Sequence, residues 1–268
     1  MHSEMRIKET MDKLPISIVV IAKNEEKRLP DCLASVKWAA EIIVVDDAST
    51  DRTIAIAESM GAKVFQRKMD REGPHRNFAI GQASQEWIMS LDADERVTPE
   101  LYESLKVMLA KQNDPHVCYS VPVRTFIGDL FLDGAGHYPA PKTRVFRKGR
   151  FSYKDEQVHP PVKYEGSCGR LTGDILHYTA PSFEHWFAKF NRETTLEAQK
   201  WISQGRKVSS LGAVRKAWSR FLKTYFQKGG ICKGFTGYFM CCLHALYQLM
   251  AYAKYRELSK HPNLYDKK

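Results

Sequence analysis

The sequence lacks the glycine and cysteine patterns of several common protein classes. The segment after the first hydrophobic run, AKNEEKR (22–28), contains no glycine. A dinucleotide-binding oxidoreductase needs a Gly-x-Gly-x-x-Gly turn there, so that the backbone can approach the pyrophosphate. The six cysteines include no Cys-x-x-Cys pair, which gives no indication of a zinc site or a small disulfide framework. Free thiols in a reducing cytosol are therefore expected.

The chain also lacks an evident targeting or membrane-spanning segment. The polar start, MHSEMRIKETMDK, has no apolar core of the kind that a signal peptide requires. Residues 234–253 carry no formal charge and are long enough to cross a bilayer. They include His244 and Gln248, however, which recur with Cys241 on one helical face. This pattern favours a two-faced helix that lies at a membrane interface or packs on the domain. An intracellular protein is expected.

The first two thirds of the chain have no excess of positive charge. Residues 1–185 hold 25 Lys/Arg and 27 Asp/Glu, a net charge of −2, whereas residues 186–268 hold 16 and 4, a net charge of +12. The overall charge of +10 therefore comes from the last third. Such a basic block indicates an anionic partner, either a membrane surface or a nucleic acid.

Strands and helices are predicted to alternate through residues 15–115. Buried β-branched runs precede polar turns, and each turn leads into a helical pattern. The runs are ISIVVIA, EIIVVD, AKVFQRK and WIMSLD, and the helical patterns are RLPDCLASVK, TIAIAESM, PHRNFAIGQASQ and TPELYESLKVMLAK. This alternation predicts an α/β fold with a mostly parallel sheet, in which ligands bind at the carboxyl ends of the strands.

The remaining chain divides into two further segments. Residues 116–181 show short strand patterns between Gly- and Pro-rich turns, which predict an antiparallel extension that carries the second substrate. Residues 182–268 are predicted to be helical, with an apolar stripe that contains Trp218 and Phe221. Residues 1–14 are expected to be a flexible N-terminus, and 15–115 a ligand-binding α/β half. A homo-oligomer stays open.

Acidic side chains follow three of the predicted strands: Glu25 the first, Asp46 and Asp47 the second, and Asp92 and Asp94 the fourth. Asp92 and Asp94 are two residues apart, so they project to the same side and can together hold Mg²⁺ or Mn²⁺. Alternatively, they are exposed turn acids near the N-terminus of the helix that starts at Pro99. Asp46 and Asp47 either accept hydrogen bonds from a nucleoside or cap the following helix.

Three segments carry a resemblance to a known family. ISIVVIAKNEE, EIIVVDDASTD and EWIMSLDADERVTPEL resemble the nucleotide-binding half of family 2 glycosyltransferases, which have the Rossmann-like GT-A fold. The KNEE opening, the DER after the D-x-D, the Lys142–Arg144–Phe146 pattern and VHP at 158–160 resemble the subgroup of the lipopolysaccharide core β-glucosyltransferases of Gram-negative bacteria. The likeness covers residues 16–178 well and the basic tail loosely.

The resemblance implies an inverting enzyme that moves a hexose, with glucose the first choice, from a UDP-sugar with the help of Mg²⁺ or Mn²⁺. Asp94 would be the chief metal ligand, and Asp92 would contact ribose or metal. The resemblance also makes residues 15–115 the nucleotide-sugar-binding half, in which Glu25 and Asp46 or Asp47 would hold the nucleoside and Arg76 would face the diphosphate. Lys23 and Asn24 would line a third wall of the same cleft. Arg144 would contact the diphosphate or the acceptor, or else belongs to a solvated strand face. The acceptor would be a lipopolysaccharide or lipooligosaccharide core or another lipid-linked glycan. A peptide or a capsule precursor remains an alternative.

Inversion needs a base that removes a proton from the acceptor hydroxyl. Many relatives have Val-His-Glu at the position of Val158 to Pro160, and the glutamate is absent here. That departure leaves the role of base to Asp155 or Glu156, with His159 assisting. His159 as a hydrogen-bonded structural histidine is an equal alternative.

The basic tail, residues 186–260, has two interpretations that involve a partner. Its aromatic and cationic residues suit nucleic acid through stacking and phosphate contacts, or anionic lipid. A membrane-bound acceptor makes lipid the better explanation, so a peripheral protein on the inner face of the cytoplasmic membrane is expected, without nucleic acid. A solvated basic face is the remaining alternative.

One other enzyme class uses a D-x-D motif with Mg²⁺. In haloacid dehalogenase-like phosphatases the first aspartate is a nucleophile on the first strand. Here the pair follows the fourth predicted strand, so the order of elements disfavours a phosphatase.

Overall fold

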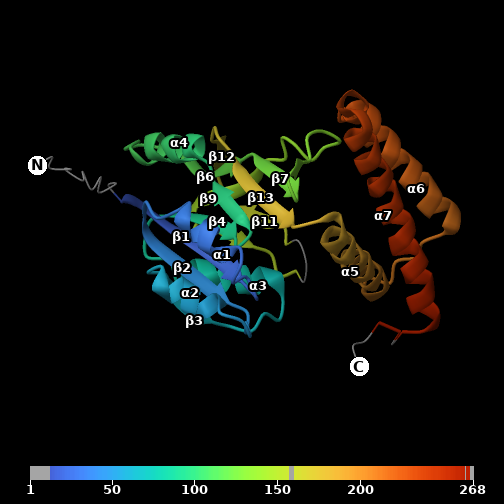
Figure 1. The fold of residues 1–268 in the computed structure, drawn as a ribbon, viewed down its shortest axis with the longest axis horizontal. Coiled ribbons are helices and arrows are strands. Elements are labelled where there is room, and N and C mark those ends of the chain that lie inside the picture. Colours follow the sequence, from blue (N-terminus) through green and yellow to red (C-terminus); the bar gives the residue numbers. More distant parts are fainter. Residues whose placement is uncertain (1–12, 157–159, 263, 266–268) are drawn as a thin grey trace, which may run out of the picture. The chain divides into compact units, whose positions relative to one another are not determined.

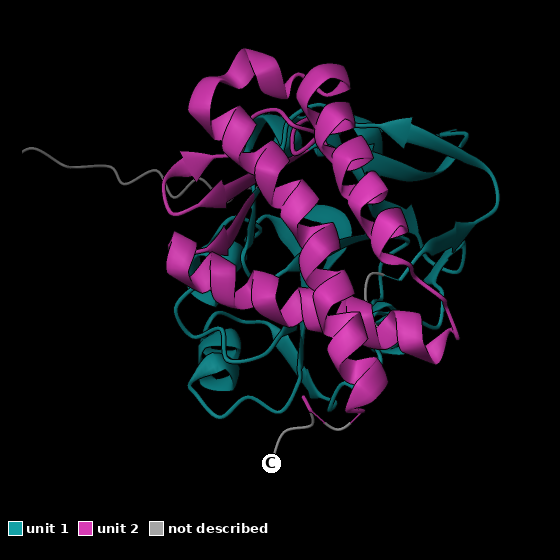
Figure 2. Ribbon diagram, turned by 90° about the vertical axis from the view of Figure 1, so that its right-hand side faces the viewer, with its two compact units in different colours: residues 1–122, 141–176 teal, residues 123–140, 177–268 magenta. Residues whose placement is uncertain are grey.

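The computed structural model describes residues 13–156, 160–262 and 264–265. These residues form two compact units, coloured separately in Figure 2. Unit 1 contains residues 13–122 and 141–176 of the described chain, and unit 2 contains residues 123–140 and 177–265. The predicted segment 116–181 is therefore divided between the two units. Residues 1–12 of the predicted flexible N-terminus lie outside the described residues.

A seven-stranded sheet, in the order β12-β6-β9-β4-β1-β2-β3, forms the centre of unit 1 (Figure 1). Strands β1 to β4 are mutually parallel, as the alternation of strands and helices predicts. The elements of this half are β1 (Leu14–Ala22), α1 (Leu29–Ala34), β2 (Ala39–Asp46), α2 (Thr53–Ser59), β3 (Lys63–Gln66), α3 (Glu72–Gly81), β4 (Trp87–Asp92), β5 (Glu95–Val97) and α4 (Pro99–Leu109).

The antiparallel extension is also present. β6 (His116–Val121) and β9 (Lys142–Arg147) pair antiparallel, and β9 pairs antiparallel with β4. β12 (Ser167–Arg170) then adds to β6 in parallel. β10 (Phe151–Tyr153) and β11 (Val162–Tyr164) form a separate hairpin-like pair. The prediction of a mostly parallel α/β sheet with an antiparallel extension is confirmed.

Register brings the carboxyl ends of the central strands together. Ala22 at the end of β1 lies opposite Asp46 at the end of β2, and Ile21 lies opposite Asp92 at the end of β4. Because the three strands are parallel, the turns that follow them all leave the same edge of the sheet. Alternation along the strands buries residues such as Val19 and Ile43 against Ala79 of α3. The strands that carry the acidic turns are therefore packed into the hydrophobic core.

Unit 2 is mainly helical. It contains β7 (Val123–Ile127), β8 (Leu130–Phe131), the end of β13 (Ile175–Ala180), α5 (Phe183–Ser203), α6 (Ser210–Leu222), the π-helix η1 (Lys223–Gln227), the 3₁₀-helix η2 (Gly230–Lys233) and α7 (Gly234–Lys260). Helix α7 packs on α5 and α6. In the described part of the chain, no helix is both long enough and apolar enough to cross a membrane.

The two faces of α7 are oriented in an unexpected way. Its small and polar face is buried: Gly237 approaches the Gly230 carbonyl so closely that an added Cβ would lie 2.2 Å from the oxygen. Cys241 is 0% exposed. The apolar face contains Phe235, which is 79% exposed, and Leu246, which is 39% exposed. The amphipathic helix therefore presents its apolar side outward. All six cysteines are free thiols, as predicted.

Candidate active site

Hydrogen bonds fasten the turn after β1 to the turn after β2. The Asn24 backbone N–H donates to Ser49 Oγ at 2.8 Å, and the Thr50 N–H donates to Asn24 Oδ1 at 2.8 Å. Asn24 has a φ of 54°, in the left-handed region that asparagine tolerates well. The Glu25 N–H donates to Thr53 Oγ1 at 2.8 Å. The predicted donor residue Asn24 therefore shapes the turn, and its side-chain oxygen is already engaged.

The two adjacent aspartates at the end of β2 occupy different environments. Asp46 is 0% exposed, and its Oδ2 accepts from the Ser49 N–H at 2.9 Å while Oδ1 has no partner in the described residues. Asp47 accepts from the Met69 N–H at 2.7 Å and pairs with Lys23 at 3.0 Å. Lys23 is 56% exposed. Asp46 thus holds the turn, whereas Asp47, which is also buried, holds the Met69 backbone and pairs with the exposed Lys23.

Arg28 links the first turn to the D-x-D turn. Its guanidinium forms two hydrogen bonds with Glu25, at 2.5 and 2.7 Å, and lies 3.5 Å from Asp94 Oδ2. Burial raises the pKa of Glu25, and Arg28 opposes that rise. The side chains of Glu25 and Asp94 are only 17% and 13% exposed. Two acids from distant parts of the sequence therefore share one cation.

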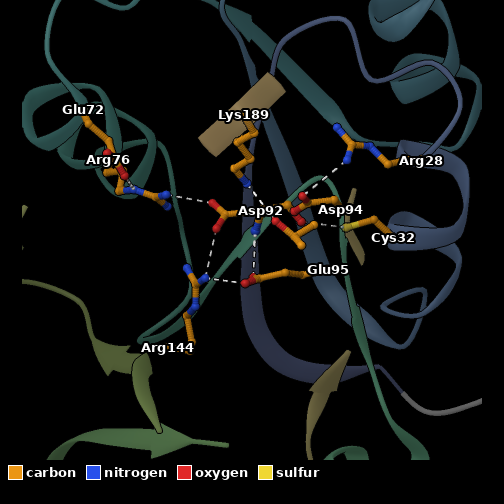
Figure 3. Close-up of polar contacts among 10 residues, drawn as sticks. Arg28, Cys32, Glu72, Arg76, Asp92, Asp94, Glu95, Arg144 and Lys189 are labelled. Carbon is orange, nitrogen blue, oxygen red and sulfur yellow. Dashed lines mark hydrogen bonds and ion pairs between the residues drawn. The ribbon is translucent and has the colours of Figure 1, made fainter. Parts of the chain in front are cut away.

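Asp92 lies between two arginines (Figure 3). Arg76 Nη2 donates to its Oδ1 at 2.8 Å, and Arg144 Nη2 donates to its Oδ2 at 3.0 Å. The same Arg144 nitrogen pairs with Glu95, which is 0% exposed and accepts from the Asp92 N–H at 3.0 Å. Burial by itself would raise the pKa of Asp92, but the charges of Arg76 and Arg144 hold the pKa well below its usual range. Asp92 is ionised.

Both arginines retain donors that no described residue satisfies. Arg76 Nη1 and Arg144 Nε are buried and have no hydrogen-bond partner. Arg76 is further held by Glu72, at 2.8 Å, and by the ring of Tyr153, 5.5 Å from the guanidinium carbon. Unsatisfied guanidinium N–H groups are suited to an oxyanion such as a diphosphate. The site thus pairs acids on one side with anion-binding donors on the other.

The segment predicted to supply the base lies beside α3. Asp155 pairs with Arg71 at 2.7 Å, and its side chain is 54% exposed. The Gly73 N–H donates to the Glu156 carbonyl at 3.1 Å. Because α3 also carries Arg76, this segment and the Asp92 network are fixed to the same helix. His159 lies outside the described residues.

The sequence interpretation assigned no role to three residues that complete this site. Arg28 falls at the start of a predicted helix, and its position three residues after Glu25 suits an ion pair within one turn. Glu95 directly follows the D-x-D pair and is the buried partner of Arg144. Glu72 stands four residues before Arg76, the spacing of a helical ion pair, and this spacing was the available signal.

The acids suit a hard divalent cation shared with a substrate. Asp92 directs both carboxylate oxygens to guanidinium groups, whereas the contact of Asp94 with Arg28 is long, at 3.5 Å. Because both oxygens of Asp92 already pair with guanidinium groups, the two acids could hold Mg²⁺ or Mn²⁺ chiefly through Asp94. Among the described residues there is no cluster of three or more metal-ligating side chains. Mg²⁺ is usually held by one or two carboxylates together with substrate phosphates.

Comparison with known proteins identifies the family. The glycosyl transferase family 2 model matches residues 17–165, which include every described residue of the site. The chain is 30% identical to the lipopolysaccharide core biosynthesis glycosyltransferase LpsC of Rhizobium meliloti over 95% of this chain and 97% of that protein. It is 31% identical to an uncharacterized glycosyltransferase of Rickettsia bellii, over 91% and 87%. The chain belongs to glycosyl transferase family 2 and is a glycosyltransferase. The alternative of a haloacid dehalogenase-like phosphatase is therefore excluded.

Solved structures show partial similarity. Glucosyl-3-phosphoglycerate synthase from Mycobacterium tuberculosis, in a complex with Mn²⁺, UDP and glucosyl-3-phosphoglycerate, aligns over 42% of this chain and 43% of that one, with a TM-score of 0.34 and 23% identity. Mannosyl-3-phosphoglycerate synthase from Rubrobacter xylanophilus aligns over 42% and 41%, with a TM-score of 0.36 and 22% identity.

Proposed function

We propose that the enzyme transfers a hexose, with glucose the first choice, from a UDP-sugar to a lipopolysaccharide core or another lipid-linked glycan, with inversion. The observation that carries this proposal is the convergence of the turns after β1, β2 and β4. Asn24 is hydrogen-bonded to Ser49, and Glu25 and Asp94 meet at Arg28. Asp92 joins Arg76 to Arg144. The similarity to LpsC along nearly the whole chain supports the lipopolysaccharide core as the acceptor.

The donor would lie across these turns. Lys23, Glu25 and Asp47 would surround the nucleoside, with Asn24 and Asp46 holding the turns in shape. The unsatisfied N–H groups of Arg76 and Arg144 would donate to the diphosphate. A bound Mg²⁺ or Mn²⁺ on Asp94 would supply Lewis-acid stabilisation of the leaving group.

The chemical step needs a proton acceptor and an anion acceptor on opposite sides of the sugar. Asp155 or Glu156, with His159, would take the proton from the acceptor hydroxyl as its oxygen attacks the anomeric carbon. The bond from that carbon to the UDP oxygen breaks, and its electron pair leaves with UDP. Arg76 and Arg144 then face the charge that develops on the diphosphate.

Release of UDP from UDP-hexoses, measured with Mn²⁺ and with EDTA, tests this proposal. Asp94→Ala is expected to reduce turnover by about 100-fold or more, because the cation loses its ligand. Asp70→Ala is the matched control, since Asp70 is 61% exposed and pairs with Arg67 at 3.1 Å. Undiminished turnover by Asp94→Ala would refute the metal assignment. Full transfer by both Asp155→Asn and Glu156→Gln would exclude those two acids as the base.

Unit 2 supports docking on an anionic membrane surface. A groove of about 690 Å³ is lined by apolar side chains of α5, α6 and α7, including Trp218, which is 62% exposed. Phe235 and Phe226, 79% and 59% exposed, extend the apolar surface. Arg220 and Lys223 are also exposed, and cations beside an apolar face suit anionic headgroups.

Vesicle flotation tests this membrane docking. The chain is expected to float with vesicles that contain phosphatidylglycerol and to stay largely unbound with phosphatidylcholine alone. Trp218→Ser together with Phe235→Ser should reduce flotation severalfold. Val107→Ser is the control, because Val107 is 63% exposed on α4 of unit 1. Equal binding to neutral vesicles would contradict the electrostatic part of the proposal.

A further inference from the structure

A second cavity, remote in sequence from the acidic turns, is lined by cations. It has a volume of about 470 Å³ and lies between the end of α5, the start of α6 and the middle of α7. Four cationic side chains line it: Arg206, Lys207, Arg215 and Lys216. None of these four forms an ion pair with a carboxylate in the part of the chain that the structure describes. The cavity therefore carries a net positive charge, which the carboxylate of Glu197 near Lys216 offsets only in part.

Trp201 fixes two of these cations. The Arg206 guanidinium carbon and the Lys216 Nζ each lie 5.4 Å from the centroid of its ring. Trp201 is 3% exposed, and its indole N–H donates to Glu197 at 2.7 Å, so the ring itself is held. Burial lowers the pKa of Lys216, and the nearby charge of Arg206 lowers it further. The two cations are thus kept close together despite their mutual repulsion.

The start of α6 also faces this cavity. Ser209, the N-cap residue, accepts from the Gly212 N–H at 3.1 Å, and both residues line the cavity. The N-terminus of a helix of 13 residues carries partial positive charge, which adds to that of the four side chains.

Gln248 gives an independent sign of a ligand. It is 7% exposed and lines the cavity, and its amide oxygen is buried without a hydrogen-bond partner among the described residues. The same residue lines an adjoining cavity of about 310 Å³ whose walls include Trp186 and Tyr247. A buried amide oxygen that accepts no hydrogen bond costs folding free energy unless a bound molecule donates to it. A sugar hydroxyl is a suitable donor, and aromatic walls suit the faces of a sugar ring.

We propose that this cationic cavity of unit 2 binds a phosphomonoester carried by a sugar of the acceptor. The phosphate would lie among Arg206, Lys207, Arg215 and Lys216, and a neighbouring hydroxyl would donate to Gln248. The inference rests on the proposed function, because it assigns to the glycan acceptor a phosphate group. It places acceptor recognition on the helical unit, separately from the donor residues of unit 1.

Calorimetric titration of the full chain with glucose 1-phosphate, in the presence of saturating UDP, tests this inference. Binding is expected with glucose 1-phosphate and not with glucose. Arg206→Gln combined with Lys216→Gln should weaken it by about tenfold or more, since two charge-assisted contacts are lost. Arg192→Gln combined with Arg256→Gln removes the same charge from exposed positions outside the cavity and should leave binding within about twofold.

The outcomes separate this site from the donor site and from lipid. The double variant should still bind UDP and release it from UDP-hexoses. If the unchanged chain binds glucose 1-phosphate as expected but releases no UDP from UDP-hexoses, the result counts against the proposed function alone. Absence of glucose 1-phosphate binding to the unchanged chain would overturn the cavity proposal. A double variant that loses only phosphatidylglycerol flotation, with unchanged glucose 1-phosphate binding, would also overturn it and assign these cations to a lipid headgroup.

Discussion

Glu95 shows how a single side chain determines the geometry of the donor site. It is 0% exposed, its Oε1 pairs with Arg144 and its Oε2 accepts from the Asp92 backbone N–H. A buried carboxylate is tolerated only when its charge is compensated. Arg144 supplies that compensation for Glu95 and also pairs with Asp92, so its removal leaves Glu95 without an ion-pair partner and Asp92 with Arg76 alone.

Arg144→Leu is therefore expected to lower the free energy of unfolding by about 3–5 kcal/mol, because the buried charge of Glu95 loses its ion-pair partner and Asp92 keeps only Arg76. Arg52→Leu is the matched control: Arg52 is 81% exposed and lies 3.5 Å from Glu26, so its loss should cost less than about 1 kcal/mol. Urea denaturation followed by circular dichroism measures both. Equal effects of the two substitutions would show that the buried network does not stabilise the fold.

The lowered pKa of Glu41 predicts that the free energy of unfolding depends on pH. Burial raises its pKa, but hydrogen bonds from Lys63, Ser17 and Ser84 outweigh that effect and lower the pKa from 4.5 to about 2. A depressed folded-state pKa contributes stability that is complete above pH 4.5 and is lost as the pH falls towards 2.

Glu41→Gln should lower the free energy of unfolding by about 2 kcal/mol at pH 7. The difference from the unchanged chain should shrink steadily between pH 4.5 and the acid limit of folding. Glu103→Gln, on the exposed side of α4, controls for the loss of one negative charge and should cost less than about 0.5 kcal/mol. A difference for Glu41→Gln that stays constant down to pH 3 would contradict this account.

At the scale of elements, α3 connects two parts of the proposed site. It contacts residues 154–156, the segment proposed to supply the base, and it carries Arg76, which is proposed to bind the donor. A Cβ added at Gly73 would lie 1.9 Å from the Lys154 carbonyl oxygen, so the helix and residues 154–156 are in direct backbone contact. Gly81, at the other end of the same helix, has nothing within 4 Å. Gly73 therefore has no room for a side chain, whereas Gly81 in the same helix does.

Gly73→Ala should destabilise the chain by about 1–3 kcal/mol and reduce transfer, because the segment with Asp155 and Glu156 must move away from α3. Gly81→Ala should stabilise it by about 0.5–1 kcal/mol through the lower flexibility of the unfolded chain. Thermal unfolding and UDP release measure the two effects. A Gly73→Ala variant with unchanged stability and turnover would show that this close contact is dispensable.

Much of the element pattern could be predicted from the sequence. The β-branched runs became strands because a buried parallel strand requires apolar residues on both faces. The capped start of α4 was readable from Thr98 and Pro99, and Thr98 does accept from Leu101. The orientation of α7 was not readable, because helical spacing defines two faces without saying which one is buried. Close packing of Gly237 on Gly230 decides that in the fold.

At the scale of the whole molecule, the sequence predicted which turns converge but not how their charges are balanced. Parallel strands bring Asp46 and Asp92 to one edge of the sheet, and the alternation of strands and helices in the sequence is enough to predict this. The sharing of Arg28 between Glu25 and Asp94 depends on side-chain directions, as does the sharing of Asp92 by two arginines. The division of residues 116–181 between two units also depends on tertiary contacts that local patterns do not encode.

Binding of UDP with and without Mn²⁺, measured by isothermal titration calorimetry on the unchanged chain and on Asp94→Asn, tests the central claim most directly. The claim is that the acids at the sheet edge hold a cation that in turn binds the diphosphate. The unchanged chain should bind UDP at least about tenfold more tightly with Mn²⁺ than with EDTA. Asp94→Asn should lose that difference while keeping the weaker, metal-free binding through Arg76 and Arg144. An equal Mn²⁺ effect in both proteins, or none in the unchanged chain, would contradict the account.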